Sequence, residues 1–297
     1  MSCIKSTSRE HQSSSWKLNQ MFILVILNVH LQSYLEQSVG CLLSQPPDLN
    51  EASQQQLLKE VKPVFTKEDN ECLSKVPSKE EVKLSISSSN LHAAPETDGL
   101  TICFYLFFWD LIGDASTEMV QYVHKGNSPS YSQRTSLMVF GSKPKKPNST
   151  KPSDKRKISL LNADFKIITG IMNERLKKIA NHTLSNCQLA VGGSDPRIHH
   201  GINLARDAIF AAGQGCEGVG ILDNDYMAAF DHMVLLWVIK VLRAKGLSEH
   251  VVKQILNLYR NNFTIVVANN VLGKRFENKH WSIRQGDRQV QSFFVME

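Results

Sequence analysis

An apolar segment that ends in two carboxylates constrains the fold of this chain more than any other feature. Residues 218–225, GVGILDND, are apolar until Asp223 and Asp225, and the apolar run MVLLWVIKVL follows at 233–242. The first segment has the length and character of a buried strand, and the second is apolar on most helix faces and predicts a buried helix. We therefore expect a mixed α+β fold in which a strand carries carboxylates to its end.

These two carboxylates predict a metal site. Side chains two positions apart share one face of a strand, so Asp223 and Asp225 point the same way. Mg²⁺ takes hard oxygen ligands from one or two carboxylates and from substrate phosphates, which suits such a pair. The alternative from these residues alone is a solvated strand end, with Asp223 or Asp231 capping the following helix. The spacing leaves both interpretations open.

Positive charge is concentrated in one segment. Lys and Arg outnumber Asp and Glu by 34 to 28, and the run KPKKPNSTKPSDKRK at 143–157 holds much of the excess. Short strands are predicted at 135–140 and 157–162, so this run forms the tip of a hairpin. Such a tip favours a polyanionic partner, contacted by Lys143, Lys145 and Lys146, although a solvated loop has the same composition.

Apolar periodicity predicts further elements. Helices are expected at 164–180, 199–212 and 249–261, and a strand is expected at 263–268. Ser78 with Glu81 three positions later predicts a capping box at the start of another short helix. A helix that ends at Gly126 is expected to bury an apolar stripe made of Phe104, Phe107, Phe108, Leu111 and Ile112.

The N-terminal 65 residues have a different composition. Ser, Gln and Asn dominate them, so residues 1–65 are expected to be poorly ordered apart from short helices near 21–38 and 51–61. The apolar run MFILVIL at 21–27 falls short of the about 20 residues that a membrane span needs, and no membrane association is expected. The six cysteines form no CxxC pair, and His199, His200 and the pair His182 and Cys187 are interpreted as structural.

Five strings, in this order, resemble the reverse transcriptases of non-LTR (LINE-type) retrotransposons. AAPETDGLTICFY resembles the APGPDG-containing passage of the fingers, with Glu96 where the family usually has Gly. KRKISLLNADFK resembles RPISLLN-D-K, with Arg156 as the matching arginine and Lys157 in place of the proline. CQLAVGG at 187–193, ILDNDYMAAFD and SIRQGD resemble the Q-x-G-F-x-x-G segment, motif A and motif B. The resemblance covers about residues 66–288.

This resemblance implies a fold and a set of roles. The fold would be a partial right-hand polymerase, with fingers at about 66–215 and an incomplete palm sheet with packed helices at about 216–297. Asp225, with Asp223 as a weaker second ligand, would bind catalytic Mg²⁺, and Phe230 would exclude a ribose 2′-OH. Arg156, Gln285 and Gly286 would contact the nucleotide. RNA template, DNA primer and deoxynucleotides would be the partners, in the nucleus or cytoplasm, with the oligomeric state open.

One departure from the family pattern bears on activity. Such polymerases supply further aspartates from a Tyr-x-Asp-Asp hairpin, and no Asp-Asp pair occurs in the chain. We therefore expect an inactive fragment of an RNA-directed DNA polymerase, since one carboxylate cannot position two metals. Two alternatives remain, namely a non-catalytic RNA- or DNA-binding protein that uses the basic hairpin, and a decayed reading frame without a stable product.

Overall fold

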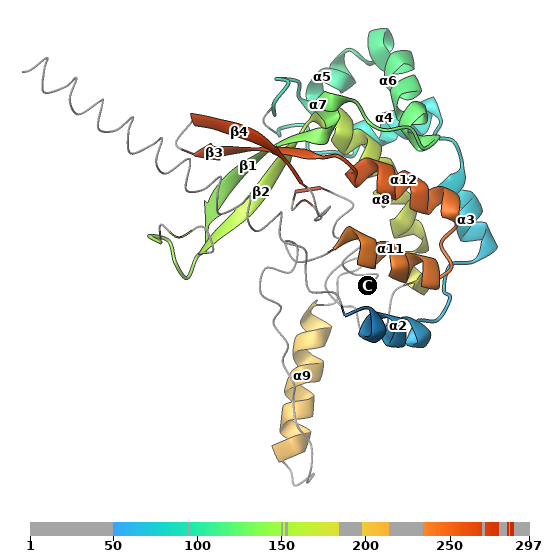
Figure 1. The fold of residues 1–297 in the computed structure, drawn as a ribbon, viewed down its shortest axis with the longest axis vertical. Coiled ribbons are helices and arrows are strands. Elements are labelled where there is room, and N and C mark those ends of the chain that lie inside the picture. Colours follow the sequence, from blue (N-terminus) through green and yellow to red (C-terminus); the bar gives the residue numbers. More distant parts are fainter. Residues whose placement is uncertain are drawn as a thin grey trace, which may run out of the picture.

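The structure is a computed structural model that describes residues 50–93, 95–149, 151, 154–183, 198–213, 234–268, 271–278, 284, 286 and 287. In this part of the chain a four-stranded sheet projects from a body of packed helices (Figure 1). The expected mixed α+β class is confirmed.

The elements follow one another in a mixed order. The helices are α2 (Glu51–Glu60), α3 (Lys67–Ser74), α4 (Lys79–Ser87), α5 (Ile102–Phe107), α6 (Trp109–His124), α7 (Tyr131–Arg134), α8 (Ala163–Thr183), α9 (Ile198–Gly213), α11 (Leu235–Ala244) and α12 (Glu249–Tyr259). The strands are β1 (Thr135–Ser142), β2 (Lys155–Leu161), β3 (Phe263–Ala268) and β4 (Val271–Glu277). The expected helices at 51–61, 164–180, 199–212, 233–242 and 249–261 all form, with ends shifted by a few residues.

The sheet is mixed, with the strand order β2-β1-β3-β4. Strands β1 and β2 form the predicted antiparallel hairpin, in which Gly141 lies opposite Arg156. Strand β3 has the predicted bounds 263–268, runs parallel to β1 and is followed by an antiparallel partner, β4, that was not predicted. The two halves of the sheet therefore come from segments far apart in the sequence.

The two faces of the sheet differ in exposure because successive side chains point to opposite sides. One face is buried and contains Ser136, Met138, Ser159, Leu161, Thr264 and Val266. The other face, called the open face below, carries apolar side chains that are only partly buried, namely Leu137, Val139, Ile158, Leu160, Phe263 and Ile265. Period-2 alternation of this kind fits a sheet with one face packed and one face accessible.

Helix α8 forms the centre of the helical body. Its apolar stripe, which includes Phe165, Ile171 and Leu176, is buried against α3, α4 and α6. Helices α11 and α12 add Leu235, Ile239, Val252 and Ile255 to the same core. Burying a side chain of this size contributes about 1.5–3 kcal/mol, so this stripe is the main apolar support of the helical body.

An arginine in α8 ties this core to α4. The Arg175 guanidinium is buried and donates two hydrogen bonds of 2.7 Å to the Glu81 carboxylate. It also donates to the carbonyl oxygens of Leu73 and Lys75. Ser78 caps α4 by accepting a hydrogen bond from the Glu81 N–H, as predicted, but the Glu81 side chain is directed to Arg175.

The predicted burial of the aromatic stripe at 104–112 is wrong for three of its members. Phe107 and Leu111 are 80% and 81% exposed, and Phe108 is 40% exposed. The expected single helix breaks at Phe108, whose backbone leaves the helical conformation between α5 and α6, so the helical phase does not continue across it. Tyr105 and Trp109 take the buried positions instead.

Order extends into the segment before residue 66. Asn50 is the N-cap of helix α2, and its side chain accepts a hydrogen bond from the Ser53 N–H. Phe65 belongs to the hydrophobic core. The proposed division at residue 66 and the state of residues 1–49 stay predictions, because residues 1–49 lie outside the described part. Among the described helices, none combines the length and apolar character that crossing a bilayer requires.

Candidate nucleotide and nucleic-acid interface

Several predicted site residues lie outside the part of the chain that the structure describes. These are Asp223, Asp225, Phe230 and Gln285, together with the string at 187–193. Within the described residues, no group of three or more His, Cys, Asp or Glu side chains is placed to hold a metal ion. The Mg²⁺ site at Asp225 and Asp223 therefore stays a prediction. Arg156, Gly286 and the three lysines can be placed.

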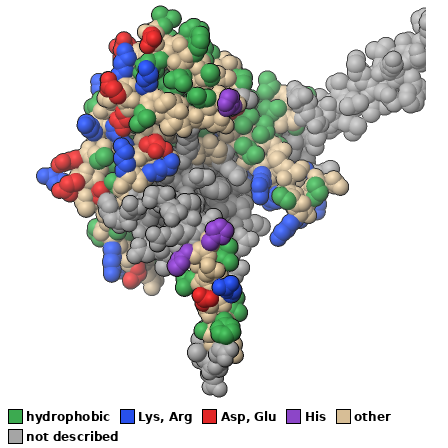
Figure 2. Space-filling view, turned by 180° about the vertical axis from the view of Figure 1, so that it is seen from behind, with side chains coloured by type: hydrophobic (Ala, Val, Ile, Leu, Met, Phe, Trp, Pro, Cys, Tyr) green, Lys and Arg blue, Asp and Glu red, His purple; other side chains and the backbone are tan. Residues whose placement is uncertain are grey.

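The basic hairpin forms as predicted, with its lysines in the β1–β2 connection. Lys145 and Lys146 are exposed, and Lys143 is partly exposed. Figure 2 shows Lys and Arg side chains gathered on this projecting part of the molecule. The Lys146 ammonium lies 2.6 Å from the Asp154 carboxylate, which also accepts a hydrogen bond from Ser149. The hydrogen bond from Lys146 lowers the pKa of Asp154 and keeps its carboxylate charged.

Arg156 projects from β2 on the open face of the sheet. Its side chain is exposed, whereas the next residue, Lys157, is buried on the opposite face. Its partner across the hairpin is Gly141, which leaves room beside the arginine because it has no side chain. Arg156 is therefore accessible to an anionic ligand from this face.

Gly286, in the motif B-like string, lies directly against β2. Its φ is +122°, and a Cβ atom at this position would lie 2.3 Å from the carbonyl oxygen of Ser159. No other residue type fits such a close approach of two backbones. Gly286 of the string RQGD thus contacts Ser159 of the string KRKISLLN, although the two residues are far apart in the sequence.

Two buried residues close to Gly286, namely Asp287 and Arg284, hold this segment in place. The Tyr259 hydroxyl of α12 donates a hydrogen bond of 2.7 Å to the Asp287 carboxylate. Burial and the neighbouring Asp287 charge raise the pKa of Tyr259 well above its ordinary value. The Arg284 guanidinium lies 4.6 Å above the Phe165 ring and donates a weak hydrogen bond to the carbonyl of Arg134. Burial lowers the pKa of Arg284, and its Nε and Nη2 atoms have no hydrogen-bond partner among the described residues.

The APETDG string meets the same region from a third side. The buried Asn162 side chain, at the end of β2, accepts hydrogen bonds from the backbone N–H and the hydroxyl of Thr97. It donates to the carbonyl of Ser132. Glu96, which stands where the resembled family has Gly, forms a 2.7 Å ion pair with Lys166 of α8. The departure at Glu96 is therefore accommodated by a local partner.

Three of the five strings thus meet at β2 and the start of α8. The buried residues that hold the Gly286 segment in place were not predicted from the sequence. The sequence patterns gave no role to Tyr259, Asp287 or Arg284. The sequence offered one sign of these contacts, namely the polar residues Arg284 and Asp287 close to Gly286. Polar side chains need hydrogen-bond partners when they are buried.

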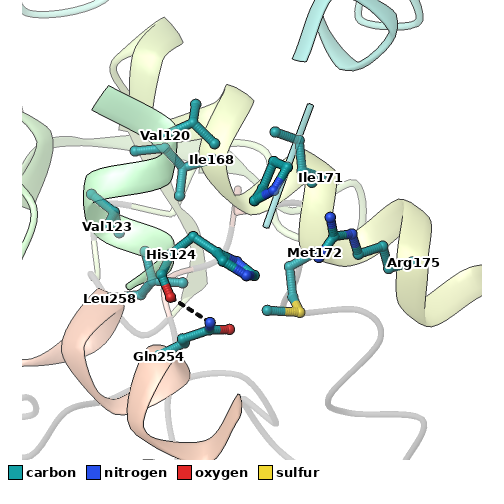
Figure 3. Close-up of a pocket in the computed structure, with 10 residues that line it drawn as sticks. Val120, Val123, His124, Ile168, Ile171, Met172, Arg175, Gln254 and Leu258 are labelled. Carbon is teal, nitrogen blue, oxygen red and sulfur yellow. Dashed lines mark hydrogen bonds between the residues drawn. The ribbon is translucent and has the colours of Figure 1, made fainter. Parts of the chain in front are cut away.

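A pocket elsewhere in the helical body contains none of the predicted site residues (Figure 3). It is lined by α6, α8 and α12, with His124, Met172 and Gln254 around it. The His124 ring hydrogen-bonds to the Ser74 carbonyl at 3.0 Å, and Gln254 donates to the His124 carbonyl. Burial lowers the pKa of His124 and favours its neutral form. The lining is mostly apolar and its polar groups serve the packing of the helices.

Comparison with known proteins gives one informative similarity. No protein-family model matches the chain. The chain is 27% identical over 209 residues to "Transposon TX1 uncharacterized 149 kDa protein" of Xenopus laevis. This alignment covers 70% of the chain and only 16% of the frog protein, so the chain spans about a sixth of that relative's length. Over most of its length the chain is thus similar to a transposon protein.

Proposed function

We propose that the chain is a fragment of the reverse transcriptase of a non-LTR (LINE-type) retrotransposon, with fingers and the start of the palm at 66–297. The contact of Gly286 with Ser159 carries this proposal, since it joins two strings that resemble the family at one place. The approach of Thr97 to Asn162 adds a third string. Similarity to a transposon protein supports the same origin.

The proposed site binds a deoxynucleotide between β2 and the RQGD segment. Arg156 offers a planar guanidinium to the triphosphate, and a lysine of the hairpin adds a mobile cation. Gln285 and Gly286 contact the nucleotide and template, and Phe230 selects against a 2′-OH. Asp225, with Asp223, is the proposed ligand set for Mg²⁺, which when bound neutralises phosphate charge. The proposed partners are an RNA template and a DNA primer.

We also propose that these 297 residues bind nucleotide without polymerising it, because they contain no adjacent pair of aspartates. Primer extension on a primed RNA template with Mg²⁺ tests this directly. The expected result is no incorporation above that of the Asp225→Asn variant. Incorporation that Asp225→Asn abolishes would overturn the inactive part of the proposal and keep the family assignment.

A second candidate function is non-catalytic nucleic-acid binding through the basic hairpin. The exposed positions of Lys145 and Arg156 favour it. Affinity for RNA should then fall steeply with salt, because bound counterions are released from the phosphates. Replacing Lys143, Lys145, Lys146 and Arg156 by Ala should flatten this dependence, and salt-independent or absent binding would contradict it.

A further inference from the structure

A second arginine occupies the edge of the sheet opposite Arg156. The Arg275 guanidinium, on β4, lies 4.8 Å from the ring centroid of Tyr131 and 4.6 Å from that of Phe263. The two rings are 5.5 Å apart and tilted by 44°. Arg275 is exposed, and about half of Tyr131 is accessible. Three elements, α7, β3 and β4, thus hold one cation at the surface.

This arrangement leaves the hydrogen-bonding edge of Arg275 available. The rings contact the guanidinium through cation–π interactions, which fix its orientation without using its N–H groups. Within the described part of the chain, Arg275 makes no hydrogen bond or ion pair through its side chain. A planar guanidinium held in one orientation can bind a phosphate with two parallel hydrogen bonds.

The surface between the two arginines is apolar and partly accessible. Arg156 lies opposite Gly141, Arg275 lies opposite Ile265, and both arginines are on the open face. The partly buried side chains of Leu137, Val139, Ile158 and Leu160 lie between them. Glu277 is on the same face beside Phe263 and is the one opposing charge on β4. A single strand of nucleic acid fits this pattern, with bases on the apolar surface and phosphates at the cationic edges.

We propose that the open face of the sheet binds single-stranded nucleic acid and that Arg275, oriented by Tyr131 and Phe263, binds its backbone phosphate. The proposal rests on the proposed function only in taking nucleic acid as the ligand. It adds residues outside the strings that resemble the reverse transcriptases. It also extends the contact surface from the hairpin tip across the whole sheet.

The test is fluorescence anisotropy of a labelled single-stranded RNA of about 20 nucleotides, titrated with the full chain at several salt concentrations. Arg275→Ala should raise Kd about five- to tenfold and reduce the salt slope by about 1, as expected for one lost phosphate contact. Arg275→Lys should also weaken binding, because lysine keeps the charge but not the planar fork. Tyr131→Leu should weaken it through loss of orientation.

Arg243 provides the matched control. It lies on α11, is exposed and is paired with Glu249, so Arg243→Ala removes the same charge away from the sheet. That variant should bind RNA with the Kd of the wild type. Glu277→Gln should bind more tightly, and a gain of affinity cannot arise from unfolding.

The outcomes separate the two proposals. Wild-type affinity in Arg275→Ala and Glu277→Gln, together with weakened binding when Lys143, Lys145 and Lys146 alone are replaced by Ala, overturns the role of the open face and leaves the proposed function intact. Absence of RNA binding by the wild-type chain at low salt overturns the open-face proposal. Nucleotide binding at Arg156 and Gly286, measured separately, then decides whether the proposed function fails as well.

Discussion

The Tyr259 hydroxyl donates a 2.7 Å hydrogen bond to the Asp287 carboxylate, and both side chains are buried. This bond connects the last turn of α12 to the residue that follows Gly286. It thereby holds the RQGD segment against β2. Removing it should loosen the site that the proposed function requires.

Tyr259→Phe tests this connection. The variant leaves a buried carboxylate without one of its donors, which should lower the free energy of unfolding by about 1–3 kcal/mol. Urea denaturation at neutral pH measures the loss. Tyr122→Phe is the control, because Tyr122 is largely exposed, and its stability should match that of the wild type. Equal stability of both variants would contradict the role given to Tyr259.

Because the pKa of Tyr259 is raised, the stability of the fold should depend on pH in the alkaline range. The folded chain holds the Tyr259 proton more tightly than the unfolded chain, whose tyrosine titrates near 10.0. This stabilisation is fully present below pH 10 and is lost as pH rises further. The wild type should therefore lose more stability than Tyr259→Phe between about pH 10 and 12. Parallel curves for the two proteins would argue against the burial of this hydroxyl.

Gly286→Ala should disrupt the contact with Ser159. The added Cβ would lie 2.3 Å from a backbone oxygen, at a φ of +122° that side chains rarely adopt. Such strain costs about 1–3 kcal/mol or displaces the segment, so nucleotide binding should fall. Gly99→Ala is the matched control, since Gly99 also has a positive φ but has open space around it. It should lose stability without losing nucleotide affinity.

The ion pair of Arg175 and Glu81 should make the stability of the fold depend on pH in the acidic range. Burial opposes ionisation of Glu81, but the hydrogen bonds and charge of Arg175 outweigh it and hold the pKa of Glu81 below 4.5. The resulting stabilisation is present above that value and is lost as pH falls through the lower, folded-state pKa. Glu81→Gln should lower stability at pH 7 by roughly 1–2 kcal/mol, a figure reduced because the carboxylate is partly solvated. Its unfolding midpoint should also change less between pH 6 and pH 3 than that of the wild type.

His124 should make the stability of the fold depend on pH in the neutral range. Its burial lowers the folded-state pKa below 6.5, so the unfolded chain binds the proton more readily. Stability is therefore lost as pH falls below 6.5. His124→Gln should reduce this loss between about pH 7 and 5 in denaturation experiments. A wild-type profile that is flat over this range would contradict the neutral, buried state of His124.

Local patterns in the sequence predicted most of the described elements. The helix at 249–261 and the strand at 263–268 followed from apolar spacing, and the hairpin followed from two short apolar runs around a Lys- and Pro-rich segment. Strand β4 was missed because VLGKRFE is exposed, contains Gly and has no apolar alternation. Its pairing with β3, rather than its own composition, makes it a strand.

Contacts between distant segments could not be derived from local patterns. The parallel pairing of β1 with β3 depends on how the intervening helices pack, and the contact of Gly286 with Ser159 depends on that pairing. The exposure of Phe107 and Leu111 was likewise hidden, because periodicity gives a stripe but does not reveal a break at Phe108. Resemblance to the family predicted that Arg156 and Gly286 share one site, whereas the contacts of Tyr259 and Arg284 near Gly286 could be found only in the structure.

Binding of a fluorescent deoxynucleotide with Mg²⁺ to the purified chain tests the central claim most directly. The account predicts saturable binding that Arg156→Ala and Gly286→Ala each weaken about tenfold or more. Arg156→Ala removes a charge-assisted contact, and Gly286→Ala displaces the segment that lies against Ser159. Arg243→Ala, the control on α11, should leave Kd unchanged. Absence of saturable binding, or equal Kd values for the wild type and Arg156→Ala, would contradict a nucleotide site between β2 and the RQGD segment.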